Sequence, residues 1–298
     1  MSVHCFYHKI DWDGFASAAI VKMEHPDVIL HPFNYDCEFP IEKIGSDDTV
    51  YFVDVSIQPI QKMFAVCEVA KKVIWIDHHK SVIDDLNVHT VIPHNLECVL
   101  DASYAACELT YMHFNFERDI PPSIKLLGQY DSWRDSPAKM KCFDTNWRDV
   151  LAFQFGMRIN PLNVEWFINS VLNAEPSPLY VVDRIIEQGR IILKYQDQQN
   201  ETAMKSSFNA TVDDMRLLCL NTGHRNSQVF QSKWNEADYD MMLAFSFMGK
   251  KWSYSVYSTK PDIDCSAFAK RYGGGGHKGA AGFYSDSLIF NATGVDDE

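Results

Sequence analysis

Residues 73–79 read Val-Ile-Trp-Ile-Asp-His-His, so that a strand-like apolar run ends in one carboxylate and two imidazoles. Three such polar side chains are costly to bury without partners. We therefore expect Asp77, His78 and His79 to line a site at the end of a strand. A purely structural role is the alternative, but caps and turns favour single Asp residues and seldom need two histidines after them.

The same arrangement occurs twice upstream. A short apolar run at 3–7 is followed by His8, Asp11 and Asp13, and another at 50–53 ends in Asp54. In a parallel α/β sheet the carboxyl ends of the strands lie side by side, and ligands bind in the crevice beyond them. These distant stretches are thus expected to converge on one pocket.

The composition limits the classes of protein to which this chain can belong. The 298 residues suffice for two domains, and 46% hydrophobic with 22% charged residues is typical of globular chains. The sequence has no apolar run near the roughly 18 residues that span a bilayer, and it begins without a signal-peptide pattern, so we expect a cytoplasmic protein with no membrane partner. Eight cysteines without a C-x-x-C pair argue against a zinc ribbon and a disulfide framework.

The net charge of −13 disfavours extended binding to duplex nucleic acid, which usually needs a basic face. An acidic chain instead suits a small anionic substrate that is approached through divalent cations.

The order of elements predicts an α/β fold. Strands at 3–7, 28–33, 50–53 and 73–76 alternate with helices at 14–23 and 57–70, which indicates a parallel sheet. Helices at 102–114 and 122–130 follow, and the second leads to Asp131. A helical linker at 179–205 is expected to join a first domain, 1–178, to a smaller α/β domain, 206–298, with strands at 216–220, 241–247 and 252–257 and a helix at 266–272.

These residues carry a resemblance. The set His8-x-x-Asp11-x-Asp13, Asp54, Asp77-His78-His79 and Asp131, followed by Gly-Gly-Gly-Gly-His-Lys-Gly-Ala-Ala-Gly-Phe at 273–283, resembles the DHH phosphoesterase superfamily with its DHH-associated C-terminal domain. The Asp11-Trp-Asp13-Gly14 form of the first motif is similar to the oligoribonuclease (nano-RNase) branch. The resemblance implies an active site in the cleft between the two domains.

The resemblance further implies two divalent metal ions, and manganese is the metal that we expect. His8, Asp11 and Asp54 would hold one ion, Asp13, Asp54, His78 and Asp131 the other, and Asp54 would bridge them. Asp77 would orient an imidazole, and His79 would face the substrate, where it would stabilise phosphoryl oxygens or protonate the leaving alcohol. Ligands without thiolates independently favour a hard cation, although zinc, iron or cobalt could occupy them. For Asp131, an ordinary helix-end aspartate is the alternative.

The tetraglycine at 273–276 can bring backbone amides close to an anion. We expect Gly274, Gly275, Gly276 and His277 to contact a substrate phosphate; a flexible turn is the alternative. Where many relatives have Arg-Ser, this chain has Tyr257-Ser258, and Tyr257 could stack on a base or bond a phosphate.

Trp133, two residues past Asp131, is a candidate platform for a base, with core packing as the alternative.

The function expected from this resemblance is a manganese-dependent phosphodiesterase that degrades short RNA or DNA oligonucleotides to mononucleotides by attack of a metal-bound hydroxide. Linearised cyclic dinucleotides and 3′,5′-bisphosphonucleosides are the rival substrates. A noncatalytic nucleotide-binding regulatory protein is the alternative from another class. The sequence leaves a homodimer open.

Overall fold

The computed structural model describes the chain apart from residues 36, 89–90, 134–146, 224–225 and 291–298, and apart from the side chains of Ser81 and His277. The chain divides into two compact units, Met1–Leu193 and Lys194–Glu298. Each unit is described by itself, and the predicted domain borders at 178 and 205 stay a prediction.

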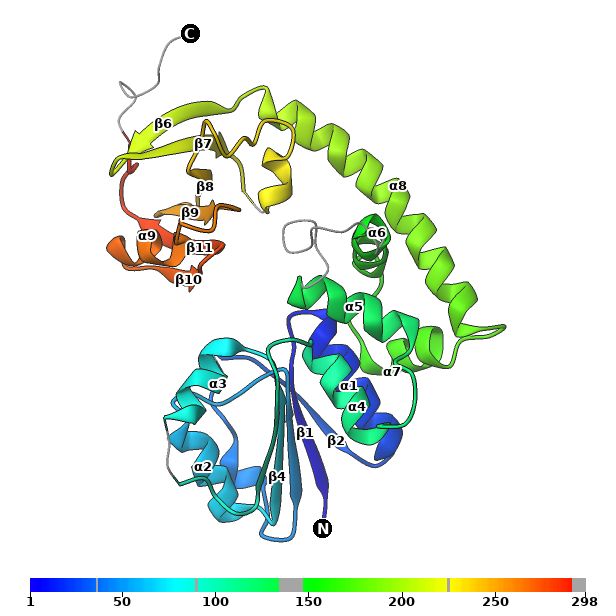
Figure 1. Cartoon of the computed structure of the whole chain (residues 1–298). Helices are drawn as coiled ribbons and strands as arrows, with labels where there is room; N and C mark the ends of the chain where they lie inside the picture. Colours follow the sequence, from blue (N-terminus) through cyan, green and yellow to red (C-terminus); the bar gives the residue numbers. More distant parts are fainter. Residues whose placement is uncertain (36, 89–90, 134–146, 224–225, 291–298) are drawn as a thin grey trace. The chain divides into compact units, whose positions relative to one another are not determined.

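The first unit is built on a five-stranded parallel sheet in the order β2-β1-β3-β4-β5 (Figure 1). The four predicted strands are confirmed, and a fifth was not predicted because it is half exposed and carries no apolar run. The strands are β1 Val3–His8, β2 Ile29–Phe33, β3 Thr49–Val53, β4 Lys72–Asp77 and β5 Leu96–Leu100.

Helices cover both faces of this sheet, as Figure 1 shows. Alternate residues of β4 point to opposite faces: Val73 and Trp75 pack with α2 and α3, whereas Ile74 and Ile76 pack with α1, α4 and α5. The helices of this unit are α1 Trp12–Glu24, α2 Gln61–Val69, α3 Lys80–Asn87, α4 Ala106–Phe114, α5 Pro122–Ser132, α6 Trp147–Met157 and α7 Val164–Phe167, with short turns at Ile41–Lys43 and Ile168–Leu172.

The predicted linker is a helix of 27 residues, α8 Pro178–Met204, which crosses the boundary between the units. It lies close to α6, since a Cβ added at Gly189 would meet the carbonyl oxygen of Ala152 at 1.6 Å. Glycine is therefore required there by backbone packing rather than by conformation.

The second unit is a mixed six-stranded sheet in the order β10-β11-β9-β8-β7-β6, in which only the β7–β8 pair is parallel. Phe268 of α9 Cys265–Arg271 packs on one face together with Leu243 and Phe283. The strands are β6 Phe208–Val212, β7 Met215–Asn221, β8 Met241–Phe247, β9 Trp252–Tyr257, β10 Gly275–His277 and β11 Ala280–Ser285, with a short turn at Ser227–Phe230. The predicted fold class is confirmed, whereas an active site between the units stays a prediction.

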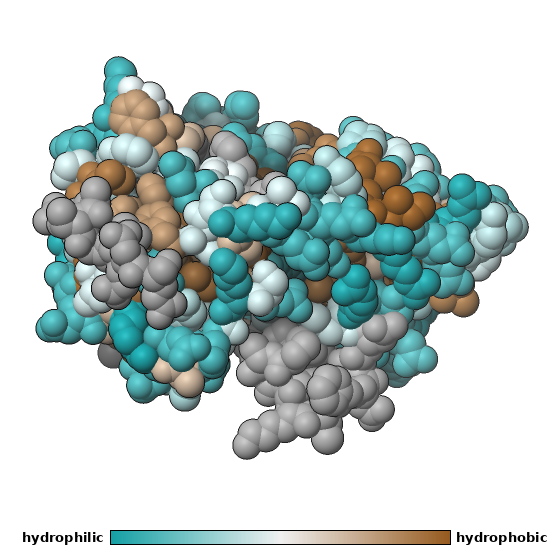
Figure 2. All heavy atoms as spheres, turned by 90° about the horizontal axis from the view of Figure 1, so that it is seen from above, coloured by the Kyte–Doolittle hydropathy of each residue, from teal (hydrophilic) through white to brown (hydrophobic). Residues whose placement is uncertain are grey.

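Hydrophilic residues cover most of the face shown in Figure 2, with hydrophobic residues scattered among them. Within the described ranges, none of the helices combines the length and the apolar character needed to cross a bilayer.

Candidate metal centre

Three strands of the first sheet deliver polar residues to one edge. His8 is the last residue of β1, Asp54 follows β3 directly, and Asp77 ends β4 and is followed by two histidines. Since β1 pairs with β3 and β3 with β4 in parallel register, these carboxyl ends are neighbours. The predicted convergence is therefore observed for these residues.

A first group of ligand atoms consists of His8, Asp11 and Asp54. The Nδ1 atom of His8 lies 3.2 Å from Oδ2 of Asp11 and 3.4 Å from Oδ2 of Asp54. Asp11 is the N-cap of α1, where its Oδ1 accepts a bond of 3.2 Å from the amide of Gly14. This cap leaves Oδ2 turned toward His8.

A second group consists of Asp13, His78 and Asp131. The Nε2 atom of His78 lies 3.1 Å from Oδ2 of Asp131 and 3.6 Å from Oδ2 of Asp13. It also lies 3.5 Å from Oδ1 of Asp54. The two oxygens of Asp54 thus face the two different groups, which is the arrangement that a bridging ligand requires.

Asp13 is fixed by the N-terminus of α4. Its two oxygens accept bonds from the amides of Ala106 at 3.0 Å and Cys107 at 2.7 Å. Amides at a helix N-terminus have no partner within the helix and favour a negative charge. Even so, burial and the charges of Asp54 and Asp131 raise the pKa of Asp13 well above its usual range.

Several buried atoms of this cluster make no hydrogen bond of good geometry, although each lies within 3.4 Å of a carboxylate oxygen or ring nitrogen of the cluster. They include Nδ1 of His8, Oδ2 of Asp54 and Nε2 of His78, one atom from each side of the centre and one from the shared carboxylate. Unsatisfied buried polar atoms are rare in folded proteins and call for an explanation, such as an ion. The donor set, carboxylates and imidazoles without thiolates, fits a pair of divalent cations.

The charge of the cluster likewise indicates a site for cations. Burial alone would lower the pKa of His8, but the carboxylates of Asp11 and Asp54 raise it to about 10. Burial likewise opposes protonation of His78, whose pKa the carboxylates around it raise to about 12. Burial raises the pKa of Asp54, which is 2% exposed. The site concentrates negative charge that cations would neutralise.

Asp77 lies behind these ligands and is fully buried. Its Oδ1 accepts bonds from the ring Nδ1 of His79 at 2.7 Å and from the amide of His78 at 2.7 Å, and its Oδ2 accepts a bond from the indole of Trp75 at 3.2 Å. Burial would raise the pKa of Asp77, but the His79 ring, the His79 amide and the charge of His78 hold it below its usual value. Asp77 therefore orients His79, while the ring of His78 faces the carboxylates.

The predicted phosphate-binding glycines belong to the second unit. Gly275 and Gly276 lie in β10, which pairs with β11, so the segment is a hairpin rather than an open loop. A Cβ at Gly274 would meet the carbonyl oxygen of Gly282 at 2.2 Å, and one at Gly276 would meet Cα of Ala281 at 2.6 Å. Packing against β11 thus explains two of the glycines, and their role toward substrate stays a prediction.

His277 ends β10, but its side chain lies outside the described residues. Tyr257 ends β9, and burial raises its pKa. The hydroxyl of Ser258 donates to the carbonyl of Asp240 at 2.8 Å, which gives it a structural role. A substrate role for these three residues stays a prediction.

Trp133 follows α5 with a φ of 51° and is 37% exposed, with its ring 5.3 Å from that of Trp147. It packs on another aromatic ring and also remains accessible on the surface of the unit.

One residue beside the centre was missed by sequence reasoning. The ring of Tyr35 lies 6.0 Å from that of His8 and 6.4 Å from that of His79, between centroids. Tyr35 follows β2 after a single intervening residue. The carboxyl end of a predicted strand was the available signal, but no ligand-type side chain drew attention to it.

No family model matches the chain. A curated relative, an uncharacterized protein of Acanthamoeba polyphaga mimivirus, is 23% identical over 292 residues, which are 95% of this chain and 58% of the relative. The chain thus spans little more than half of that relative's length.

Solved structures resemble the chain along nearly all of its length. The pGpG-specific phosphodiesterase PggH of Vibrio cholerae is 12% identical with a TM-score of 0.50, over 96% of this chain and 94% of that one. The exonuclease RecJ bound to manganese is 15% identical with a TM-score of 0.52, over 96% and 86%. The chain therefore shares the α/β fold of these two proteins. The fold that the sequence motifs implied is therefore confirmed.

Proposed function

We propose that this DHH-fold protein is a metal-dependent phosphodiesterase that hydrolyses short oligonucleotides to mononucleotides. The observation that carries the proposal is the position of Asp54. One of its oxygens lies 3.4 Å from His8 and the other lies 3.5 Å from His78, so one carboxylate joins two separate groups of ligands.

The residues of the two groups would hold two divalent cations, with manganese as the first expectation. His8, Asp11 and Asp54 form one set, and Asp13, Asp54, His78 and Asp131 form the other. When bound, such a pair supplies an activated water near neutral pH and neutralises charge on the phosphate. The burial of Asp13 and Asp54, at 3% and 2% exposed, keeps bulk water from these oxygens.

His79 is the group that this chain offers to the phosphate itself. The bond of Nδ1 to Asp77 fixes the ring and leaves Nε2 as its other nitrogen. Burial opposes the charged form, but Asp77 outweighs it and raises the pKa of His79. A charged ring donates from Nε2, so His79 can bind a phosphoryl oxygen or protonate the leaving oxygen.

Substrates of one to a few nucleotides fit the charge of the chain, since a net charge of −13 opposes the polyanion of a long duplex. The likeness to PggH supports a second candidate within the same chemistry, the linear dinucleotide pGpG. A 3′,5′-bisphosphonucleoside and noncatalytic nucleotide binding are further outcomes of the test.

The test incubates the full chain and manganese with a diribonucleotide, pGpG, a 20-nucleotide RNA, a bisphosphorylated adenosine and pyrophosphate. We expect mononucleotides from the diribonucleotide, with slower turnover of the long RNA. Turnover of pyrophosphate alone contradicts the proposal, and binding of the diribonucleotide without turnover favours the noncatalytic alternative.

A further inference from the structure

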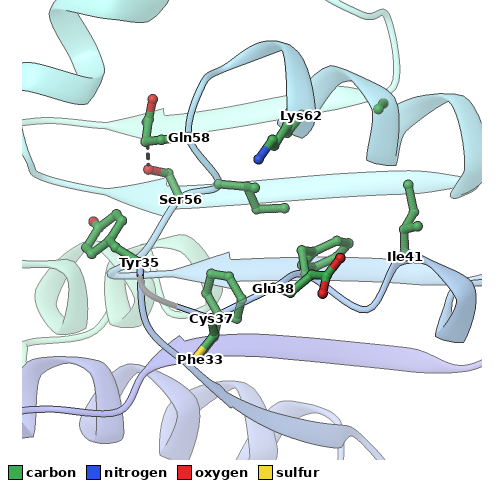
Figure 3. Close-up of a pocket in the computed structure, with 11 residues that line it drawn as sticks. Phe33, Tyr35, Cys37, Glu38, Ile41, Ser56, Gln58 and Lys62 are labelled. Carbon is green, nitrogen blue, oxygen red and sulfur yellow. Dashed lines mark hydrogen bonds between the residues drawn. The ribbon is translucent and has the colours of Figure 1, made fainter.

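A pocket of about 280 Å³ lies in the first unit beside the metal centre, and no role in the proposed reaction has been given to it (Figure 3). Its walls come from two segments. Phe33, Tyr35, Cys37, Glu38, Phe39 and Ile41 follow or end β2, and Ser56, Ile57, Gln58, Lys62 and Ala65 lie after β3 and in α2.

Tyr35 joins this pocket to the metal centre. Its ring centroid lies 6.4 Å from that of His79, and Tyr35 also lines the pocket. Burial and the charges of Asp77 and Asp54 raise the pKa of Tyr35. Ser56 is two residues from the central Asp54 and also lines the pocket.

The lining has the chemistry of a site for a flat, partly polar ring. Phe33, Phe39 and Tyr35 give the lining aromatic carbon, while Glu38 and Lys62 offer an acceptor and a donor from opposite walls. The amide of Gln58 donates to Ser56 at 3.0 Å, which fixes one polar group of the wall. Aromatic side chains stack on any base, and charged groups can bond its edge.

The volume of the pocket limits the size of the ligand that it can hold. A volume of about 280 Å³ is at the low end of ligand pockets, which run from about 300 to 1,000 Å³. One base with its sugar fits such a space better than a dinucleotide does. The cationic and anionic groups balance, so the pocket offers no site for a bare phosphate.

We propose that this pocket holds one nucleobase of the substrate, on a nucleotide whose phosphate lies at the metal centre. The inference rests on the proposed function and deepens it, because it makes the enzyme selective for nucleotides over other phosphodiesters. Tyr35 separates the base from the imidazoles and stacks against it.

Ala65→Trp tests the proposal by filling the pocket from α2, and Glu68→Trp is the matched control, since Glu68 is exposed on the same helix and does not line the pocket. Each variant hydrolyses a diadenylate and its abasic analogue. We expect Ala65→Trp to raise KM for the diadenylate by about tenfold, the effect of losing a stacked base, and to leave the abasic analogue unchanged. Glu68→Trp should match the original protein on both substrates.

Lys62→Met serves as a second variant if Ala65→Trp fails to melt cooperatively. It removes a hydrogen-bond donor from the wall and should raise KM for the diadenylate alone. Equal KM values for the two substrates in the unmodified protein, or equal losses on both in the variants, overturn the inference while leaving the hydrolase intact.

A binding measurement separates the inference from the proposed function. Stacking quenches the fluorescence of 2-aminopurine, so we expect a dinucleotide that carries it to be quenched by the original protein and by Glu68→Trp but not by Ala65→Trp. If the protein hydrolyses nothing, the proposed function fails, and this quenching pattern still decides the pocket. Equal quenching by all three proteins overturns the inference.

Discussion

Asp54 and Asp77 are both buried carboxylates at strand ends, but their surroundings differ. Asp77 accepts bonds from backbone amides, an indole and an imidazole. Asp54 has an oxygen without a hydrogen-bond partner and a backbone φ of 59°, which is uncommon outside glycine, asparagine and aspartate. Unsatisfied groups and local strain of this kind gather at functional sites. These surroundings distinguish Asp77, whose oxygens bond donors of the protein itself, from Asp54, which is placed to bind a ligand.

Asp54→Asn should abolish function with little loss of stability. Asparagine also tolerates the positive φ, and its neutral amide relieves the charge repulsion in the cluster. We expect turnover to fall by about 100-fold or more, because one shared anionic ligand is lost. Manganese titration and thermal melting measure the two effects. Asp84→Asn, on the exposed face of α3, is the control, and near-normal activity of Asp54→Asn would disprove the bridging role.

Asp77→Asn should destabilise the first unit and, because Asp77 orients His79, should also lower turnover. The amide NH₂ would face donors that now bond a carboxylate, and a lost bond to a buried charged group costs about 1.5–3 kcal/mol. We expect a loss of about 3 kcal/mol in urea unfolding. An unchanged unfolding midpoint would show that these donors find other partners.

The residue types at the strand ends made the convergence of these side chains predictable, since three polar residues cannot follow an apolar strand without partners. The groups that form hydrogen bonds with these side chains could not be predicted from the sequence. The bonds from Ala106 and Cys107 to Asp13 join residues 93 and 94 positions apart, and backbone amides carry no sequence signal. Tyr35 was missed because its importance comes from the position of β2 and not from its type.

At the scale of elements, the apolar strands were predictable and the polar or exposed ones were not. Neither α3, which is short, nor β5, which lies at the sheet edge, was predicted, and α6, β6 and β11 were missed as well. The glycines at 273–276 were expected to contact a phosphate or to form a turn, but Gly275 and Gly276 lie in a strand. The missing Cβ atoms of Gly274 and Gly276 let this segment approach β11 closely. Close packing of strands and anion binding by backbone amides both favour glycine, so the sequence does not distinguish them.

The contact between α4 and α5 affects the positions of Asp13 and Asp131. Glu108 near the start of α4 accepts a bond from the amide of Ala105 at 3.2 Å and lies against Gly128 of α5. Asp13 is bonded to the first amides of α4, and Asp131 lies one turn after Gly128. The spacing of these helices therefore sets the distance between Asp13 and Asp131.

Gly128→Ala should disturb this spacing, because the new Cβ would meet Oε2 of Glu108 at 2.2 Å. Helix propensity favours alanine by about 1 kcal/mol, but overpacking of a buried contact costs about 1–3 kcal/mol. We expect a net loss of about 1 kcal/mol and about tenfold lower activity, measured by urea unfolding and turnover. Lys125→Ala, exposed on the same helix, should change neither. A more stable and fully active Gly128→Ala would show that the side chain of Glu108 moves aside freely.

Each of the two units of the molecule has a hydrophobic core of its own. In the second unit Asp240 holds the sheet together: it accepts bonds from the guanidinium of Arg216 at 3.1 Å and from the amine of Lys260 at 2.8 Å. These cations, Arg216 first, hold the pKa of Asp240 well below its usual range. The alternation of the first hundred residues predicted the first unit, but nothing in the sequence indicated this network.

Stability of the second unit should therefore fall in acid. A depressed carboxyl pKa contributes stability that is complete above the unfolded value of about 3.9 and is lost as the pH falls through the lower folded value. Asp240→Asn should cost about 1–2 kcal/mol at pH 7, from its charge-assisted bonds, and progressively less below pH 3.9. Urea unfolding at several pH values, followed in the original chain and the variant, measures this. A difference that stays constant with pH would show that the charge of Asp240 contributes nothing.

The ligands that surround Asp54 come from the ends of two strands, the start of α1 and the end of α5, and span residues 8 to 131. An unfolded chain holds them too far apart to chelate an ion together. Cations that bind the assembled centre therefore shift the folding equilibrium of the first unit by mass action. If the first unit binds cations as proposed, their availability sets how long that unit stays folded.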